Sequence, residues 1–280
     1  MEKLSLKEKL KSVIDKRPVL SCLVMLIIVY LLYAFPGMMT RVFPFLKEHY
    51  FYRFISAIFS HYVVVLMVIM LLDYGWIYRK GNFLKTLLVG MALITEASLS
   101  CYFSIVGAFR SAADSSFLSF PYILLGIITI IGIGFFEESF FRGVISNIIG
   151  KHYAKDRKGV WLSVFISSVF FGLLHMVNMF YGVKLLPAII QSVVAVFAGM
   201  ALCATYYRGG SIWAMMFIHS LIDFGPLFGT SFLANPELVD EAAVVNQFGL
   251  VNLTPALISL LITLFLLRNS KIHEAIDHFK

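Results

Sequence analysis

Apolar residues run through the chain in stretches long enough to cross a lipid bilayer, separated by short segments rich in polar or charged residues. A transmembrane helix needs about 20 mainly apolar residues. The pattern therefore predicts an all-α, polytopic membrane bundle of eight transmembrane helices. We expect these helices over residues 19–35, 54–72, 84–107, 121–149, 159–180, 185–206, 211–228 and 253–267. The fourth is longer than a bilayer requires because a polar cluster interrupts it.

The predicted helices fall into three regions. Residues 1–120 hold the first three helices, and residues 121–229 hold four helices that carry polar residues in apolar surroundings. Residues 230–280 hold an outer loop, the last helix and a tail. The basic segment at the start leads into an apolar run without a small-residue cleavage site. We therefore interpret that run as a first span and not as a cleaved signal peptide.

Composition excludes a soluble globular protein. Hydrophobic residues make up 60% of the chain and charged residues only 14%, whereas soluble domains carry roughly a quarter charged residues. The net charge of +7 does not indicate a nucleic-acid partner, because the Lys and Arg residues flank the apolar runs. The segments predicted on the same side of the membrane as the N-terminus hold 17 Lys and Arg residues, and the segments on the opposite side hold 5.

That charge distribution predicts the orientation in the membrane. Loops rich in Lys and Arg stay in the cytoplasm, so we expect both termini to be cytoplasmic. The short loops and compact termini are typical of a bacterial plasma-membrane protein rather than one of the endoplasmic reticulum.

Ionisable residues inside the predicted helices are the strongest indication of chemistry. Such a side chain costs about 2.5–3.5 kcal/mol in the hydrocarbon region, so it usually marks function. The candidates are Glu137, Glu138 and Arg142 on the fourth helix, His175 on the fifth, and His219 and Asp223 on the seventh. Counting from the cytoplasmic helix ends at ~1.5 Å per residue, the depths of Glu137, His175 and His219 are roughly 21, 25 and 16 Å. Three helices therefore carry polar groups at similar depth.

The spacing within each helix predicts how these groups pair, because residues three or four apart share a helix face. Glu138 and Arg142 can pair in this way, while His175 shares a face with Asn178 and His219 shares one with Asp223. Glu137 is turned about 100° from Glu138, so one carboxylate can pair with Arg142 while the other faces the interior. A carboxylate in a dry cavity can act as a general base on water. A histidine can share that proton or stabilise an oxyanion, so we expect water activation, most simply for peptide hydrolysis.

Motifs of other intramembrane proteases are missing from the sequence. It contains no H-E-x-x-H of a zinc protease and no G-x-G-D of an intramembrane aspartyl protease. Residues 229–231, Gly-Thr-Ser, resemble the start of a rhomboid-like serine motif, but Phe232 stands where a glycine is expected. We therefore set the serine mechanism aside.

Three motifs together resemble a known family. Residues 137–142, EESFFR, match E-E-x-x-x-R, residues 171–175, FGLLH, match F-x-x-x-H, and residues 219–223, HSLID, match H-x-x-x-N/D. In this order on hydrophobic helices they resemble the CPBP family of intramembrane proteases, which includes the CAAX prenyl endopeptidase Rce1 and bacterial Abi proteins. The resemblance covers about residues 121–229, under half of the chain.

The resemblance implies a role for each site residue. Glu137 would activate the water with His175, and His219 and Asp223 would line the oxyanion side. The residues with supporting roles would be Glu138, Arg142 and Asn178. The prenyl endopeptidase has Asn at the position of Asp223, and ionised Asp cannot donate a hydrogen bond to an oxyanion. Asp223 would instead orient His219, carry a proton or bind a cation.

Cofactor and partners follow from the same resemblance. We expect no metal, because no two of the histidines share a helix face, while zinc held by the histidines and carboxylates is the alternative. The expected partners are the lipid bilayer and a peptide or protein substrate, either lipidated as in the prenyl endopeptidases or without a lipid. We expect no nucleic acid.

Structural interpretations compete with the catalytic one. Glu138 and Arg142 can equally form a buried ion pair with a purely structural role. Asn178 is also suited to a hydrogen bond between helices. Glu96 lies outside the motifs. The alternative function is a non-proteolytic membrane protein of the same fold, such as a bacteriocin-immunity or regulatory factor or a transporter.

Overall fold

The computed structural model describes residues 6–111, 116–234, 242 and 245–280. Within these residues the protein is helical, apart from one isolated antiparallel bridge between Phe117 and Leu233. Seven described segments are long and apolar enough to span a membrane, namely Pro18–Val42, Tyr50–Leu72, Met91–Arg110, Phe120–Tyr153, Arg157–Tyr181, Leu185–Gly209 and Ile212–Phe232. The prediction of a polytopic, all-helical membrane bundle is confirmed.

The predicted eighth span corresponds to a shorter apolar helix. Leu250–Leu266 overlaps the predicted range 253–267 but has fewer than 18 residues. Seven of the eight predicted spans therefore have a counterpart of membrane-spanning length among the described residues. The last is a shorter helix that packs against the bundle.

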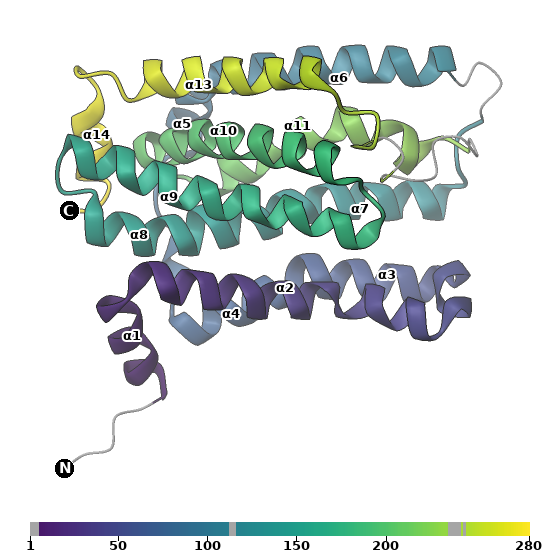
Figure 1. The fold of residues 1–280 in the computed structure, drawn as a ribbon, viewed down its shortest axis with the longest axis horizontal. Helices are drawn as coiled ribbons and strands as arrows, with labels where there is room; N and C mark the ends of the chain where they lie inside the picture. The colour runs from purple at the N-terminus through teal and green to yellow at the C-terminus, as the bar shows by residue number, and fades with distance from the viewer. Residues whose placement is uncertain (1–5, 112–115, 235–241, 243–244) are drawn as a thin grey trace.

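Figure 1 shows the helices packed in three layers with roughly parallel axes. The first layer contains α2 (Pro18–Val42), α3 (Tyr50–Ile58), the π-helix η2 (Phe59–Val63) and α4 (Val64–Leu72). The middle layer contains α7 (Phe120–Glu137), the π-helix η4 (Glu138–Ile145), α8 (Ser146–Tyr153), α9 (Arg157–His175), α10 (Leu185–Gly209) and α11 (Ile212–Phe232). The outer layer contains α6 (Met91–Ser111) and α13 (Thr254–Leu266).

Short helices flank or connect these layers. They are α1 (Leu6–Lys16), η1 (Pro44–Glu48), η3 (Gly75–Tyr78), α5 (Phe83–Val89), η5 (Met176–Tyr181), η7 (Leu250–Leu253) and α14 (Ile272–Asp277). In Figure 1, α1 and α14 lie at the same end of the bundle. This arrangement agrees with both termini on one side of the membrane. Which side is cytoplasmic stays a prediction from the charge distribution.

The predicted third span is two helices and not one. α5 ends at Val89 and α6 begins at Met91, on either side of Gly90. A Cβ atom at Gly90 would lie 2.6 Å from Ile218 Cδ1, so a side chain there would collide with α11. The membrane-length helix at this position is therefore Met91–Arg110.

Two glycines let the helices of the middle layer approach closely beside the polar cluster. A Cβ at Gly134 on α7 would lie 2.5 Å from Ser220 Oγ on α11. A Cβ at Gly172 on α9 would lie 2.4 Å from Val196 Cγ2 on α10. Small residues at helix contacts are the usual route to close packing in membranes, and here they bring the backbones that carry the polar cluster together.

Candidate active site

The glutamate pair lies where α7 passes into the π-helix η4, inside the long segment Phe120–Tyr153. A π-turn widens the helix and frees carbonyl groups from their usual partners, and such turns are frequent at functional sites. Ser146 Oγ donates to the Arg142 carbonyl at 2.7 Å, and Asn147 Nδ2 donates to the carbonyls of Arg142 and Gly143, each at 2.9 Å. The polar cluster therefore widens the fourth span without breaking it.

Glu138 and Arg142 form a buried ion pair on η4. Arg142 Nη1 donates to Glu138 Oε1 at 2.8 Å, and the side chains of Arg142 and Glu138 are 2% and 0% exposed. The pair has the i,i+4 spacing expected from the sequence. Because an unpaired charge buried at this depth is strongly unfavourable, each side chain holds the other in place. Glu137, on the neighbouring helix face, keeps 14% of its side chain exposed.

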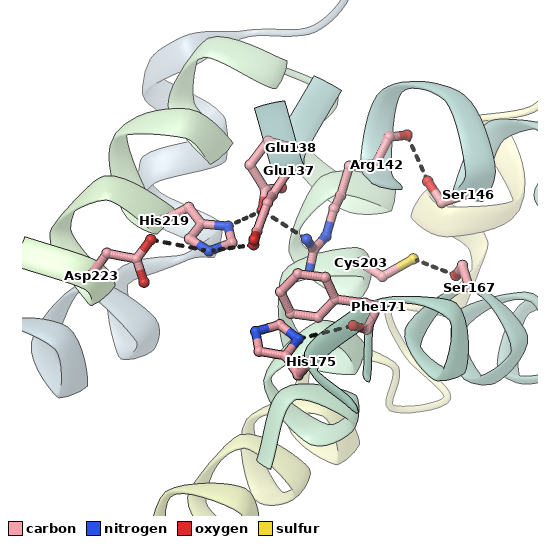
Figure 2. A network of polar contacts seen from close by, with 10 residues as sticks. All are labelled: Glu137, Glu138, Arg142, Ser146, Ser167, Phe171, His175, Cys203, His219 and Asp223. Atoms are coloured by element: carbon pink, nitrogen blue, oxygen red, sulfur yellow. Dashed lines mark hydrogen bonds and ion pairs between the residues drawn. The ribbon is translucent and has the colours of Figure 1, made fainter. Parts of the chain in front are cut away.

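His219 on α11 lies beside the two glutamates, with Asp223 on its other side (Figure 2). Its Nδ1 is 2.5 Å from Glu138 Oε1, and its Nε2 is 3.2 Å from Glu137 Oε2. Asp223, one turn further along α11, has its Oδ2 3.6 Å from the same Nε2, which is an ion-pair distance. The structure thus gathers three carboxylates from two helices around one buried imidazole.

This arrangement determines where the protons of the cluster can lie. A carboxylate oxygen only accepts hydrogen bonds, so the Nδ1–H of His219 donates to Glu138. The Nε2 atom also faces carboxylate oxygens. A proton must therefore lie between His219 Nε2 and those oxygens, either on the ring or on a carboxyl group. The cluster is suited to hold and transfer a proton at this nitrogen.

His175 reaches the cluster from α9. Its Nδ1 is 3.0 Å from the carbonyl oxygen of Phe171. A carbonyl only accepts, so Nδ1 carries the hydrogen and Nε2 of the neutral ring keeps its lone pair. In the described part of the chain no hydrogen-bond partner contacts that Nε2. Figure 2 shows the ring of His175 on the side of the cluster where Glu137 and His219 meet.

The Phe171 ring contacts site residues from three helices. Its centroid is 5.0 Å from that of His175 and 5.9 Å from that of His219, both edge-on. The Arg142 guanidinium lies over the ring at 4.5 Å. Phe171 is the first residue of the F-x-x-x-H motif, but sequence reasoning assigned it no role. Its i,i+4 spacing from His175 was the signal that could have revealed it.

Two sequence candidates lie apart from this cluster. Asn178 Nδ2 donates to Gln191 Oε1 on α10 at 2.9 Å, and within the described residues it makes no hydrogen bond to the cluster. Glu96 lies half-buried on α6, in the outer layer. No hydrogen bond or ion pair joins it to the other described site residues. The supporting role of Asn178 stays a prediction, and its observed contact is a link between two helices.

The side chains of the cluster do not fit a metal ion as they are arranged. Among the residues that the structure describes, no three His, Cys, Asp or Glu side chains form a group that could hold one. Zinc ligands surround the ion at about 2.0–2.2 Å. Here Nδ1 of His219 is occupied by Glu138, and Nε2 contacts carboxylate oxygens directly. We derive no step through a metal.

Comparison with known proteins identifies the middle of the chain. Residues 119–225 match the model of a family described as type II CAAX prenyl endopeptidase Rce1-like. No curated protein and no solved structure matches the chain. The matched segment contains all three motifs, and the buried contact between Glu138 and His219 is consistent with the catalytic residues of that family. Residues 119–225 of this membrane protein are therefore similar to the Rce1-like family of type II CAAX prenyl endopeptidases.

Proposed function

We propose that the protein is a membrane-embedded endopeptidase that hydrolyses a peptide bond of a membrane-associated or hydrophobic peptide. The observation that carries the proposal is the contact of both ring nitrogens of His219 with the adjacent carboxylates of Glu137 and Glu138. Ionisable side chains inside a membrane span cost free energy, so an imidazole held between carboxylates there usually marks a functional site. The match of residues 119–225 to a peptidase family supports the same conclusion.

Water activation is assigned to Glu137 and His175. Glu137 is the partly exposed glutamate of the pair, whereas Glu138 is fully buried against Arg142. The lone pair on His175 Nε2 offers a second acceptor. In the proposed step, the water oxygen bonds to the substrate carbonyl carbon while its proton passes to Glu137, with His175 orienting the water.

His219 is assigned to the opposite side of the reaction. With a proton on Nε2 it can stabilise the oxyanion and then protonate the leaving nitrogen as the C–N bond breaks. Glu138 fixes the ring through Nδ1, and Asp223 favours the charged ring by its proximity to Nε2. In this proposal Asp223 orients His219 and does not contact the oxyanion, so an aspartate can stand at this position.

The substrate class is proposed from the family match. CAAX-type endopeptidases act on peptides with a lipidated cysteine, and a substrate anchored by a lipid would reach a site inside a membrane bundle by lateral diffusion. We therefore propose a peptide that carries a prenylated cysteine near its C-terminus. A hydrophobic peptide without the lipid is the second substrate form to test.

The test is cleavage of a quenched-fluorescent peptide library by the purified full-length protein. Each peptide is supplied with and without a prenylated cysteine, and the wild type is compared with Glu137→Gln. Glu96→Gln is the matched control, because it removes another carboxylate from a membrane helix outside the cluster. Loss of a general base lowers the rate by about 10²–10⁴-fold, so we expect Glu137→Gln to lose turnover and Glu96→Gln to keep it.

Two other outcomes would change the assignment. Full inhibition by a chelator, reversed by added zinc, would replace the metal-free mechanism with a metal-dependent one. No turnover of any peptide by folded wild-type protein, together with an unchanged cellular phenotype in Glu137→Gln, would instead support a non-proteolytic protein of the same fold.

A further inference from the structure

A surface cavity with several polar side chains in its wall lies in the first layer, and none of the candidate active-site residues lines it. It has a volume of about 350 Å³ and lies between the end of α2, the start of α3 and the end of η5. Its polar lining includes Tyr33, Tyr52, Tyr181, Ser56, Ser60 and His61. Neither the candidate active site nor the family match accounts for this cavity, because its first-layer residues precede position 119.

The charge on the cavity wall is positive. Lys47 and Arg53 line it, and no acidic residue does. The Arg41 guanidinium lies 5.1 Å from the ring centroid of Tyr181, which also lines the cavity. Within the described residues, none of these three cations forms an ion pair.

The sequence makes these cations unexpected. Of the five Lys and Arg residues predicted on the side away from the termini, Arg41, Lys47 and Arg53 are three. Positive charge is disfavoured on that side of a membrane protein. Arg41 donates to the Phe180 carbonyl at 2.6 Å, and Arg53 lies 5.6 Å from the centroid of the Tyr122 ring. Neither contact supplies a negative charge, whereas a bound anion would.

One buried hydroxyl in the cavity also lacks a partner. Ser56 Oγ is inaccessible to solvent and has no hydrogen-bond partner among the described residues. Other polar groups of the wall are already engaged: Tyr52 donates to the Pro36 carbonyl at 2.7 Å and Ser60 to the Tyr33 carbonyl at 2.8 Å. Because a buried hydroxyl without a partner is unfavourable, Ser56 is a donor left available for a ligand.

The surroundings of the cavity favour a lipid as the source of the anion. α2 ends at Val42 and α3 begins at Tyr50, so the cavity lies near helix ends, where lipid headgroups meet the protein. The flanking side chains of Phe35 and Phe51 are large, apolar and exposed. They offer surface for acyl chains next to a cationic cavity, and Lys and Arg side chains at the membrane surface attract anionic lipid headgroups.

We propose that this cavity binds the phosphate group of an anionic phospholipid. Lys47 and Arg53 neutralise the phosphate, and Ser56 donates a hydrogen bond to it. The acyl chains follow the exposed apolar faces of α2 and α3. Because the cavity floor at His61 packs against Gly132, on the helix that carries Glu137, a bound lipid would fix the first layer against the catalytic layer.

The test counts lipids retained by the detergent-solubilised full-length protein in native mass spectrometry, titrated with phosphatidylglycerol and separately with phosphatidylcholine. Each cation near an anionic headgroup contributes about a fivefold change in affinity. We therefore expect Lys47→Gln/Arg53→Gln to weaken phosphatidylglycerol binding about tenfold or more. The matched control, Arg110→Gln/Lys184→Gln, removes two exposed cations from the same predicted side and should change binding less than twofold.

Ser56→Val tests the site without changing charge. We expect it to weaken phosphatidylglycerol binding several-fold and to leave phosphatidylcholine binding unchanged. Equal losses in the two double variants would overturn the proposal in favour of nonspecific surface charge. Displacement of the lipid by inorganic phosphate alone would show a site for soluble phosphate. Unchanged lipid binding in Lys47→Gln/Arg53→Gln, with a raised KM for peptides that have a free C-terminal carboxylate, would assign the cavity to substrate.

Discussion

At the scale of single residues, the carboxylate of Glu138 balances the positive charge inside the candidate site. Its Oε1 atom accepts hydrogen bonds from both Arg142 and His219. Without this carboxylate the Arg142 guanidinium would remain charged and buried, a defect that typically costs about 3–5 kcal/mol. We expect Glu138→Gln to lower the free energy of unfolding by about that amount and to abolish turnover, as measured by unfolding in mixed micelles and peptide cleavage.

A double variant separates the two effects. Replacing both partners, Glu138→Met with Arg142→Met, removes the pair and should recover much of the lost stability, because a buried pair is often no better than apolar packing. It should not recover turnover, because His219 loses its Nδ1 partner. Turnover close to wild type in a folded double variant would show that Glu138 has only a structural role.

Phe171 is predicted to position the two histidines. Phe171→Leu removes the edge contacts to His175 and His219 and the cation–π contact to Arg142, which is worth up to about 2 kcal/mol when desolvated. We expect kcat to fall about tenfold with little change in KM. Phe165→Leu, at an exposed position on the same helix, should leave kcat unchanged. A rise in KM alone would instead place Phe171 in substrate binding.

Much of the site could be predicted at this scale. The i,i+4 spacing indicated the Glu138–Arg142 and His219–Asp223 pairs, because it depends on helix geometry alone. Which histidine meets which glutamate depends on how α11 and α9 pack against α7. One sequence carries no such information, so the double contact of His219 with Glu137 and Glu138 emerged only from the structure.

At the level of elements, the π-helix η4 determines how the glutamates are presented. Asn147 Nδ2 lies within hydrogen-bond distance of two η4 carbonyls and of the Tyr206 hydroxyl, which links η4 to α10. Asn147→Leu leaves these acceptors without their donor, at about 1–3 kcal/mol. We expect a loss of stability of that size together with a clear fall in kcat, measured on the same preparation.

A buried hydroxyl in an ordinary α-helix provides the comparison. Ser163 donates to the Gly159 carbonyl at 2.7 Å on α9, away from the π-turn. Ser163→Ala should cost stability without lowering kcat. If Asn147→Leu lost stability but kept its kcat, the π-turn would contribute to packing only and would not position the glutamates for catalysis.

The membrane helices could be predicted because long apolar runs determine them. The local irregularities of these helices could not be predicted. The break at Gly90 reflects a close approach to Ile218, a residue more than 100 positions away. The widening at η4 depends on Ser146 and Asn147 satisfying freed carbonyls. Both outcomes rest on contacts of a few kcal/mol that the apolar pattern does not encode.

At the scale of the whole molecule, the C-terminal segment closes one end of the bundle. Arg208 on α10 donates twice to Glu274 Oε2, each at 3.1 Å, and Lys80 Nζ donates to the His278 carbonyl at 2.5 Å. The His278 ring packs against Tyr206 and Tyr207. Docking of this segment therefore joins α14 to the helix that contacts Asn147.

Protonation of His278 should release this segment. Burial, together with the positive charges of Lys80 and Lys85, lowers the pKa of His278 to about 3. A released histidine titrates near 6.5, so between these values the undocked state binds more protons and docking weakens as the pH falls. The docked state is fully favoured above about pH 6.5 and loses ~1.4 kcal/mol per pH unit below it.

This release can be measured by hydrogen exchange of the backbone amides in residues 272–280. The exchange is compared at neutral and mildly acidic pH and corrected for intrinsic rates. His278→Phe keeps the ring contacts but removes the titration, so its protection should not depend on pH in this window. Although burial opposes it, hydrogen bonds from Lys271 and Arg208 lower the pKa of Glu274, so this carboxylate takes up a proton at a lower pH than a released histidine does. The same pH dependence in His278→Phe would assign the release to another group.

Hydrolysis by water activated at Glu137 is tested most directly by a single turnover in water enriched in oxygen-18, with the best peptide from the library. The wild type should release an N-terminal fragment whose new carboxyl group carries one oxygen-18, and Glu137→Gln should release none above background. An unlabelled carboxyl group in the first turnover would show that an enzyme side chain attacks the peptide. Labelled product formed equally fast by Glu137→Gln would contradict the assignment of the base.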